Sequence, residues 1–169
     1  VAAGYVVYGS STMLMYTTKN GTHGFTLDPS VGSYLLSHPY LKMPSRGKIY
    51  SINEGYSQRW DEPLKKYIEN LKSKNYSARY IGSMVADVHR TLLKGGVFAY
   101  PGDKKNPQGK LRLLYEAAPM SLLIEQAGGR ATDGINEILS IKATSLHQRT
   151  PVFMGSKEDI DELVNYMKG

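Results

Sequence analysis

The residues that could do chemistry in this sequence are most concentrated between positions 100 and 116, YPGDKKNPQGKLRLLYE. The basic residues of this stretch are Lys104, Lys105, Lys110 and Arg112. Phosphate groups are bound by fixed positive charge and several hydrogen-bond donors, which lysine and arginine side chains supply. A carboxylate, Glu116, follows and could bind a hard cation if further oxygen ligands came from elsewhere. The stretch therefore predicts an anion site with a metal ligand beside it.

A second interpretation of the same stretch stays open. Gly102 and Gly109 would let a polar surface loop turn sharply, and solvated lysines are common in such loops. Arg112 and Glu116 are four residues apart, so in a helix they would form a surface ion pair worth a few tenths of a kcal/mol. In the functional interpretation, Lys110 lies at the start of a helix over 111–127, whose first amides attract anions.

Two other segments could add donors to such a site. SINEGYS (51–57) follows an expected strand, and Asn53 and Tyr56 could donate from the end of that strand, where α/β proteins place ligands. ARYIGSMVADVHR (78–90) places Gly82 and Ser83 at the start of an expected helix. Taken singly, each segment is equally compatible with a plain turn or helix cap. The sequence contains no HExxH or GxGxxG pattern.

Length and composition indicate a globular protein of ordinary type. The chain has 169 residues, 41% hydrophobic and 21% charged, and no run approaches the roughly 20 apolar residues of a membrane span. Cysteine is absent, which excludes disulfides and thiolate metal sites and favours a cytoplasmic location. The chain begins at Val1 inside an apolar stretch, so we expect a piece of a larger protein.

The net charge of +6 favours anionic partners. Most basic residues are scattered, and no nucleic-acid-binding signature is present, so we expect no nucleic-acid partner. A compact anion such as a sugar phosphate suits the few clustered lysines better.

The elements that must position these residues follow from the periodicity. Strands are predicted over 12–18, 24–27 and 33–37, with a hairpin turn at Asn20-Gly21, and further strands over 48–52, 97–100 and 151–155. Helices are predicted over 60–74, 83–93, 111–127 and 156–167. We expect all strands to share one mixed sheet flanked by helices, which is an α/β fold.

Several of these segments together resemble one family. They are VAAGYVVYGSS (1–11), FTLDPSVGSYLL (25–36), NEGY (53–56), RYIGSMVADVHRTLL (79–93), GKLRLLYE (109–116), MSLLIEQAGG (120–129) and LHQRTPVFMGS (146–156). In order and spacing the chain resembles the C-terminal half of class I fructose-1,6-bisphosphatase. The resemblance implies a layered α/β/α sugar phosphatase fold. It also implies that residues 1–169 are the C-terminal substrate-binding domain, the N-terminal metal and AMP domain lying outside this chain.

The resemblance also implies roles for individual residues. Those expected at the substrate are Asn53, Glu54, Gly55, Tyr56, Arg79, Tyr80, Gly82, Ser83, Met84, Tyr100, Lys105, Lys110, Leu111 and Arg112. Among them, Asn53, the three tyrosines and Lys110 would hold the 6-phosphate, and Arg79 would reach a neighbouring subunit's site. Glu116 matches a metal ligand, and no catalytic residue is assigned in this half.

The implied activity is hydrolysis of the 1-phosphate of fructose 1,6-bisphosphate to fructose 6-phosphate, a reaction of gluconeogenesis, in a cytoplasmic homotetramer. The cofactor would be Mg²⁺, or Mn²⁺ or Zn²⁺, held mostly by residues outside this chain, so the isolated chain is expected to be inactive. Two alternatives stay open: a non-catalytic sugar-phosphate binding or assembly module, and a sedoheptulose-1,7-bisphosphatase.

Overall fold

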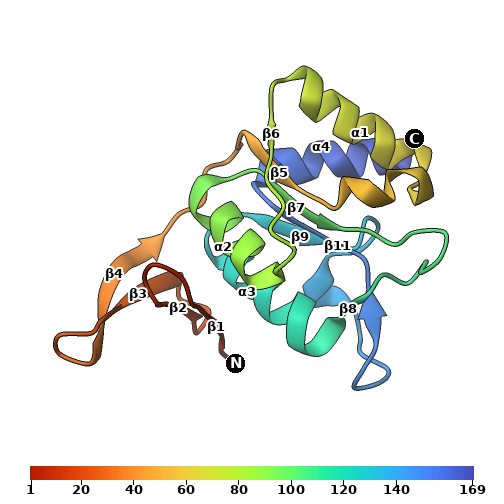
Figure 1. Ribbon diagram of the computed structural model, residues 1–169. Helices are drawn as coiled ribbons and strands as arrows, with labels where there is room; N and C mark the ends of the chain where they lie inside the picture. Colours follow the sequence, from red (N-terminus) through yellow and green to blue (C-terminus); the bar gives the residue numbers. More distant parts are fainter.

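The computed structural model describes residues 1–169. The chain folds into two parts, a β-meander and a layered body (Figure 1). The meander is a four-stranded antiparallel sheet of β1 (Ala3–Val7), β2 (Met13–Thr17), β3 (Thr22–Asp28) and β4 (Ser33–Leu41), in chain order. The predicted hairpin turn at Asn20-Gly21 is confirmed, and Gly21 has the positive φ of 76° that favours glycine.

The body is built on a five-stranded mixed sheet in the order β6-β5-β7-β11-β9. Its strands are β5 (Ile49–Ser51), β6 (Ser77–Ala78), β7 (Val97–Tyr100), β9 (Arg130–Thr132) and β11 (Val152–Gly155). β5 is parallel to β6 and β7, whereas β11 is antiparallel to β7 and β9. The predicted α/β class is confirmed, but the prediction of one shared sheet is wrong. The meander is a separate sheet, and β8 (Leu111–Arg112) pairs with β10 (Arg149–Thr150) in a third.

Helices cover both faces of the central sheet (Figure 1). α1 (Glu62–Ser73) and α4 (Lys157–Lys168) lie on one face, and α2 (Met84–Lys94) and α3 (Ala118–Gln126) on the other. Along β7, Phe98 packs with the α2–α3 cluster, and its neighbours Val97 and Ala99 pack with the α1–α4 cluster. Short 3₁₀ turns occupy Glu54–Arg59 and Ile138–Ser140. None of the helices combines the length and apolar character needed to cross a bilayer.

The predicted helix over 111–127 is wrong at its start. Leu111 and Arg112 are extended and pair with Thr150 and Arg149 in the β8–β10 sheet. A π-helical turn, η2 (Leu113–Ala117), comes next, and the regular helix α3 begins only at Ala118. Lys110 therefore lies before a strand, and the expectation that helix amides beside it attract an anion is not fulfilled.

The strand predicted over 33–37 is longer than expected. β4 continues through Pro39 to Leu41, beyond the predicted end. A register shift in the β3–β4 pairing between Thr22 and Gly24 accommodates this part of the strand. Proline is tolerated in a strand at such bulges and at sheet edges, and β4 is an edge strand.

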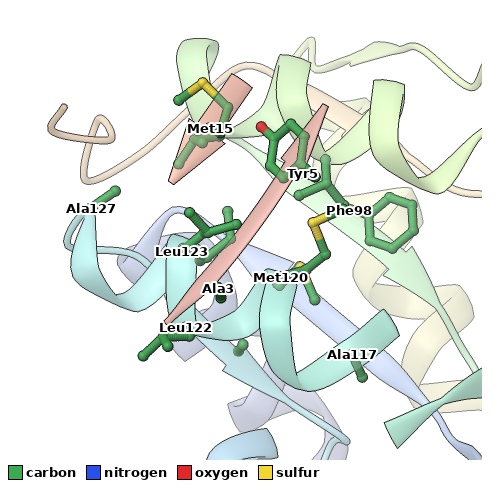
Figure 2. Close-up of a cluster of buried hydrophobic side chains, with 14 of the residues drawn as sticks. Ala3, Tyr5, Met15, Phe98, Ala117, Met120, Leu122, Leu123 and Ala127 are labelled. Atoms are coloured by element: carbon green, nitrogen blue, oxygen red, sulfur yellow. The ribbon is translucent and has the colours of Figure 1, made fainter. Parts of the chain in front are cut away.

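The meander packs on the body through one apolar cluster (Figure 2). Tyr5 and Met15 of the meander belong to the same buried cluster as Met120 and Leu123 of α3. The hydroxyl of Thr22 also donates to the carbonyl oxygen of Leu123 at 2.7 Å. This cluster keeps β1 next to α2 and α3, where two of the predicted site segments lie.

Candidate functional site

Four of the predicted residues, Asn53, Tyr56, Tyr100 and Lys110, line one pocket, which we call the tyrosine–lysine pocket. Asn53 follows β5 and Tyr100 ends β7. Because these strands are parallel neighbours, their carboxyl ends meet at the same sheet edge. The complete lining comprises Ile52, Asn53, Tyr56, Trp60, Ala99, Tyr100, Pro101, Asp103, Asn106 and Lys110.

Positive charge gathers around the ring of Tyr56. The Nζ atom of Lys110 lies 5.1 Å from the ring centroid, and the guanidinium carbon of Arg59 lies 4.6 Å from it. Cations at these distances interact favourably with the aromatic face. Asn53 caps the 3₁₀ turn, since its Oδ1 atom accepts from the Gly55 amide at 3.1 Å. This bond fixes the orientation of the Asn53 amide group, with its nitrogen on the side away from Gly55.

Tyr80 adjoins this pocket. Its partial burial raises the pKa of the phenol, and the charges of Tyr100 and Asp87 raise it further, while a hydrogen bond with Asn53 acts in the opposite direction. The hydroxyl of Tyr80 consequently stays protonated at neutral pH. It can donate a hydrogen bond to an anion held between Asn53 and Tyr100.

Residues 101–110, which carry Lys104, Lys105 and Lys110 and which we call the lysine loop, contribute only one lysine side chain to the pocket wall. Asp103 organises the loop by accepting hydrogen bonds from the amides of Lys105 and Asn106 at 2.8 and 2.7 Å. Lys104 and Lys105 are exposed and outside the pocket lining, whereas Lys110 is half-buried within it. The predicted contribution of Lys105 to substrate binding stays a prediction.

Three other predicted residues are not brought into the pocket. The carboxylate of Glu54 pairs with the Lys72 ammonium of α1 at 2.6 Å and accepts from the hydroxyl of Tyr50, in β5, at 2.7 Å. Gly55 is exposed and offers its amide to Asn53. Arg79 is exposed, and its guanidinium donates to the carbonyl oxygen of Ala78.

A second, separate hollow lies beside η2 and the start of α2, and we call it the glutamate hollow. Ser83, Met84 and Glu116 are among the residues that line it. Gly82, with φ of 87°, turns the chain just before them. Leu111 is buried in the core beneath. Three of the predicted residues from α2 and η2 are therefore neighbours in space.

The carboxylate of Glu116 is held mainly by backbone. Its Oε2 atom accepts from the Arg112 amide at 2.7 Å, and the Arg112 guanidinium lies farther away at 3.7 Å. The surface ion pair considered for these two residues is therefore a minor part of the arrangement. Oε1 accepts no hydrogen bond within the chain and is available to another ligand.

These residues fit a divalent metal ion in part. Nowhere in the chain do three His, Cys, Asp or Glu side chains gather as a metal-binding cluster. Hard cations such as Mg²⁺ take six or more oxygen ligands, and Glu116 has one free carboxylate oxygen. The donor set thus matches a single ligand position, with the others required from outside this chain.

The sequence did not single out every residue of the pocket. Trp60 and Asn106 line it, although neither was predicted. Asn106 lies within the lysine loop, so its position was a usable signal. Trp60 shows only the apolar periodicity of a helix start, which carries no functional information.

Comparison with known proteins agrees with this geometry. The family model described as "Fructose-1-6-bisphosphatase, C-terminal domain" matches residues 43–168, which is most of the chain. The chain belongs to the fructose-1,6-bisphosphatase family. The N-terminal domain model of the same family matches residues 1–39, which include β1 to β3 and most of β4.

Individual relatives support the same family. A class 1 fructose-1,6-bisphosphatase of Sulfurihydrogenibium sp. is 64% identical over 99% of this chain and 52% of its own length. A cytosolic fructose-1,6-bisphosphatase of Oryza sativa subsp. indica is 57% identical over 96% of this chain and 50% of its length. The expected membership of class I is confirmed. The chain spans about half the length of the curated relatives it matches.

A solved fructose-1,6-bisphosphatase shows the same fold. The apo form from Leishmania major superposes with a TM-score of 0.97 at 51% identity, covering 100% of this chain and 55% of that one. The expected sugar phosphatase fold is thereby confirmed.

Proposed function

We propose that this chain is the C-terminal, sugar-phosphate-binding part of a fructose-1,6-bisphosphatase. The complete protein would hydrolyse the 1-phosphate of fructose 1,6-bisphosphate to give fructose 6-phosphate, a step of gluconeogenesis. One observation carries the proposal: Asn53, Tyr56, Tyr100 and Lys110 converge on a single pocket from two separate stretches of the sequence, 53–56 and 100–110.

The pocket would hold the 6-phosphate, far from the bond that breaks. Lys110 provides the positive charge, and the hydroxyls of Tyr56, Tyr80 and Tyr100 with the Asn53 amide provide neutral donors. Energy released by binding this remote group fixes the position of the sugar, which lowers the entropic cost of reaction at the other end.

The reacting end would lie at the glutamate hollow. Gly82, Ser83 and Met84 would contact the sugar, and Leu111 and Arg112 would lie behind the 1-phosphate. Glu116 would give one oxygen ligand to Mg²⁺, or to Mn²⁺ or Zn²⁺. When bound, such a cation neutralises phosphate charge and acidifies a water molecule. The remaining ligands would come from the other half of the protein.

The assembly and location follow as proposals from the same family membership. Arg79 is exposed, with only a backbone carbonyl as partner, and would reach the site of a neighbouring subunit in a homotetramer. Lys105 would add charge at the mouth of the pocket. A cytoplasmic location is supported by the cytosolic rice relative and by the absence of cysteine.

The proposal is tested by assaying phosphate release from fructose 1,6-bisphosphate with Mg²⁺. We expect negligible turnover by this chain alone and activity when it is joined to the N-terminal half of the Sulfurihydrogenibium relative. Full turnover by the chain alone would contradict the division of roles. Preferred turnover of sedoheptulose 1,7-bisphosphate by the joined protein would overturn the substrate assignment.

A further inference from the structure

Asp87 is a buried carboxylate that the proposed site does not use directly. It lies in the first turn of α2, and its side chain is 0% exposed. Oδ1 accepts from the Ile81 amide at 3.0 Å, and Oδ2 accepts from the Gly82 amide at 3.0 Å. Asp87 therefore satisfies two amides that precede the helix. Ser83, at the N-cap, makes no side-chain bond of this kind.

Arg90 completes this arrangement. Its Nη2 atom donates to Oδ1 of Asp87 at 2.6 Å and also to the carbonyl oxygen of Arg79. A buried carboxylate is stable only when it is paired and fully hydrogen-bonded, and here the partners are all in the 79–82 loop or one turn along α2. The pair thus ties the loop to the helix.

The same loop has a second anchor on its other side. The Arg79 amide donates to the Tyr50 carbonyl oxygen at 2.9 Å, which extends the β5–β6 pairing. Tyr80 is the single residue between this anchor and the Ile81 amide bound by Asp87. Its backbone is consequently held from both sides, even though its side chain is 40% exposed.

We propose that Asp87, with Arg90, is a positioning residue for substrate binding that fixes the 79–82 loop so that the Tyr80 hydroxyl faces the sugar phosphate. The proposal rests on the proposed function, because it assigns to Tyr80 a contact in the tyrosine–lysine pocket. Asp87 itself touches no substrate and acts through the loop.

The test measures binding of fructose 6-phosphate to the 169-residue chain by calorimetry. We expect Asp87→Asn to weaken binding about tenfold, in line with the loss of charge-assisted hydrogen bonds. Arg90→Lys keeps the positive charge and should weaken binding by a smaller factor. This variant replaces Asp87→Asn as the test if Asp87→Asn fails to fold. In the Tyr80→Phe background, Asp87→Asn should weaken binding by less than twofold, because the contact it positions is already lost.

Asp159 provides a matched control on the opposite face of the sheet. It is also 0% exposed, accepts from the Gly47 amide at 2.8 Å and the Tyr76 hydroxyl at 2.7 Å, and pairs with Arg46. Asp159→Asn should lower the melting temperature as Asp87→Asn does, yet leave the affinity for fructose 6-phosphate unchanged.

The outcomes separate this inference from the proposed function. Unaltered binding in both Asp87→Asn and Arg90→Lys, with tight binding by the unmodified chain, would overturn the positioning role alone. Equal weakening by Asp159→Asn would also overturn it, since the effect would then be general destabilisation. Absence of binding by the unmodified chain would overturn the proposed function and this inference with it.

Discussion

Lys110 and Lys105 are five residues apart in one loop, but their environments differ. Lys110 is half-buried in the tyrosine–lysine pocket, and Lys105 is exposed outside it. We predict that Lys110→Met weakens binding of fructose 6-phosphate roughly 10- to 100-fold, as expected for a charge-assisted hydrogen bond of about 1.5–3 kcal/mol. Titration calorimetry of this chain measures the change.

The comparison variant is Lys105→Met. Exposed charges are screened within about 10 Å at 0.1 M salt, so any effect of this variant should disappear as salt is raised. The effect of Lys110→Met should persist. If the two variants behaved alike at high salt, Lys110 would not be the cation of the pocket.

At the residue scale, the sequence identified groups whose chemistry is visible in their type. Lysine and tyrosine near strand ends predicted an anion site, and Asn53, Tyr56, Tyr100 and Lys110 do meet. Side-chain direction was not predictable. Glu54 pairs with Lys72, which is 18 residues further along the chain, instead of lining the pocket. The burial of Asp87 depends on the loop folding back over α2, which no local pattern encodes.

At the scale of elements, Gly109 forms the turn that connects the lysine loop to β8. Its φ is +71°, and a Cβ atom there would lie 2.5 Å from the Thr150 carbonyl oxygen. We predict that Gly109→Ala displaces Lys110, destabilises the fold by at least about 3 kcal/mol and weakens sugar-phosphate binding. Urea denaturation and calorimetry give the two values.

Gly32 supplies the control for that change. Its φ is +64°, but a Cβ atom there would meet nothing within 4 Å. Gly32→Ala should therefore cost only the strain of a left-handed alanine, about 1–2 kcal/mol, and leave binding unchanged. Equal costs for both substitutions would show that crowding at Thr150 is unimportant.

Glu162 links α4 to α1 and to the segment before β5. Burial acts to raise its pKa, but hydrogen bonds from Lys74, Arg46 and Asn70 outweigh this and lower the pKa to about 2. A carboxylate with a depressed pKa stabilises the folded state above its unfolded pKa, and that contribution is lost as pH falls through the folded value. Its contribution is therefore full above about pH 5 and disappears toward pH 2.

We predict that Glu162→Gln lowers stability at pH 7 but makes no difference at pH 2. The buried Asp159 nearby has a raised pKa, chiefly through burial, and therefore the opposite pH dependence. Because the charge of Glu162 contributes to the raised pKa of Asp159, the difference between the two urea midpoints includes a smaller, opposing change at Asp159. A difference that stays constant from pH 7 to pH 2 would contradict the depressed pKa.

The elements themselves were largely predictable, with physical reasons for the exceptions. Apolar periodicity located α1, α2 and α4, and turn residues located β2, β3 and the first part of β4, whereas β1 was not predicted. The start of α3 was missed because Leu111 and Arg112 pair with a strand about 40 residues away, a tertiary contact that overrides helical propensity. The division of the strands into three sheets depends on pairings between residues far apart in the sequence, which local sequence does not reveal.

At the scale of the whole molecule, the two candidate binding regions are joined by a short rigid connection. Lys110 lines one, Glu116 lines the other, and β8 and η2 lie between them. The β8–β10 pairing and the bond from the Arg112 amide to Glu116 fix this spacing. In the proposed function, this chain would hold one end of a sugar bisphosphate while the other end reaches metal ligands from the other half of the protein.

Because the two binding regions are separate, we predict that Glu116→Gln affects catalysis but hardly affects binding of fructose 6-phosphate. Binding of fructose 6-phosphate to the chain alone should change by less than about twofold, because Glu116 lies outside the tyrosine–lysine pocket. In the protein completed with the relative's N-terminal half, activity should fall at least about tenfold and require more Mg²⁺, because the carboxylate proposed as a metal ligand has become a neutral amide. Phosphate release measured against Mg²⁺ concentration gives both values. Wild-type Mg²⁺ dependence in Glu116→Gln would exclude this carboxylate as a metal ligand, and the glutamate hollow would then have to hold the sugar without taking part in metal binding.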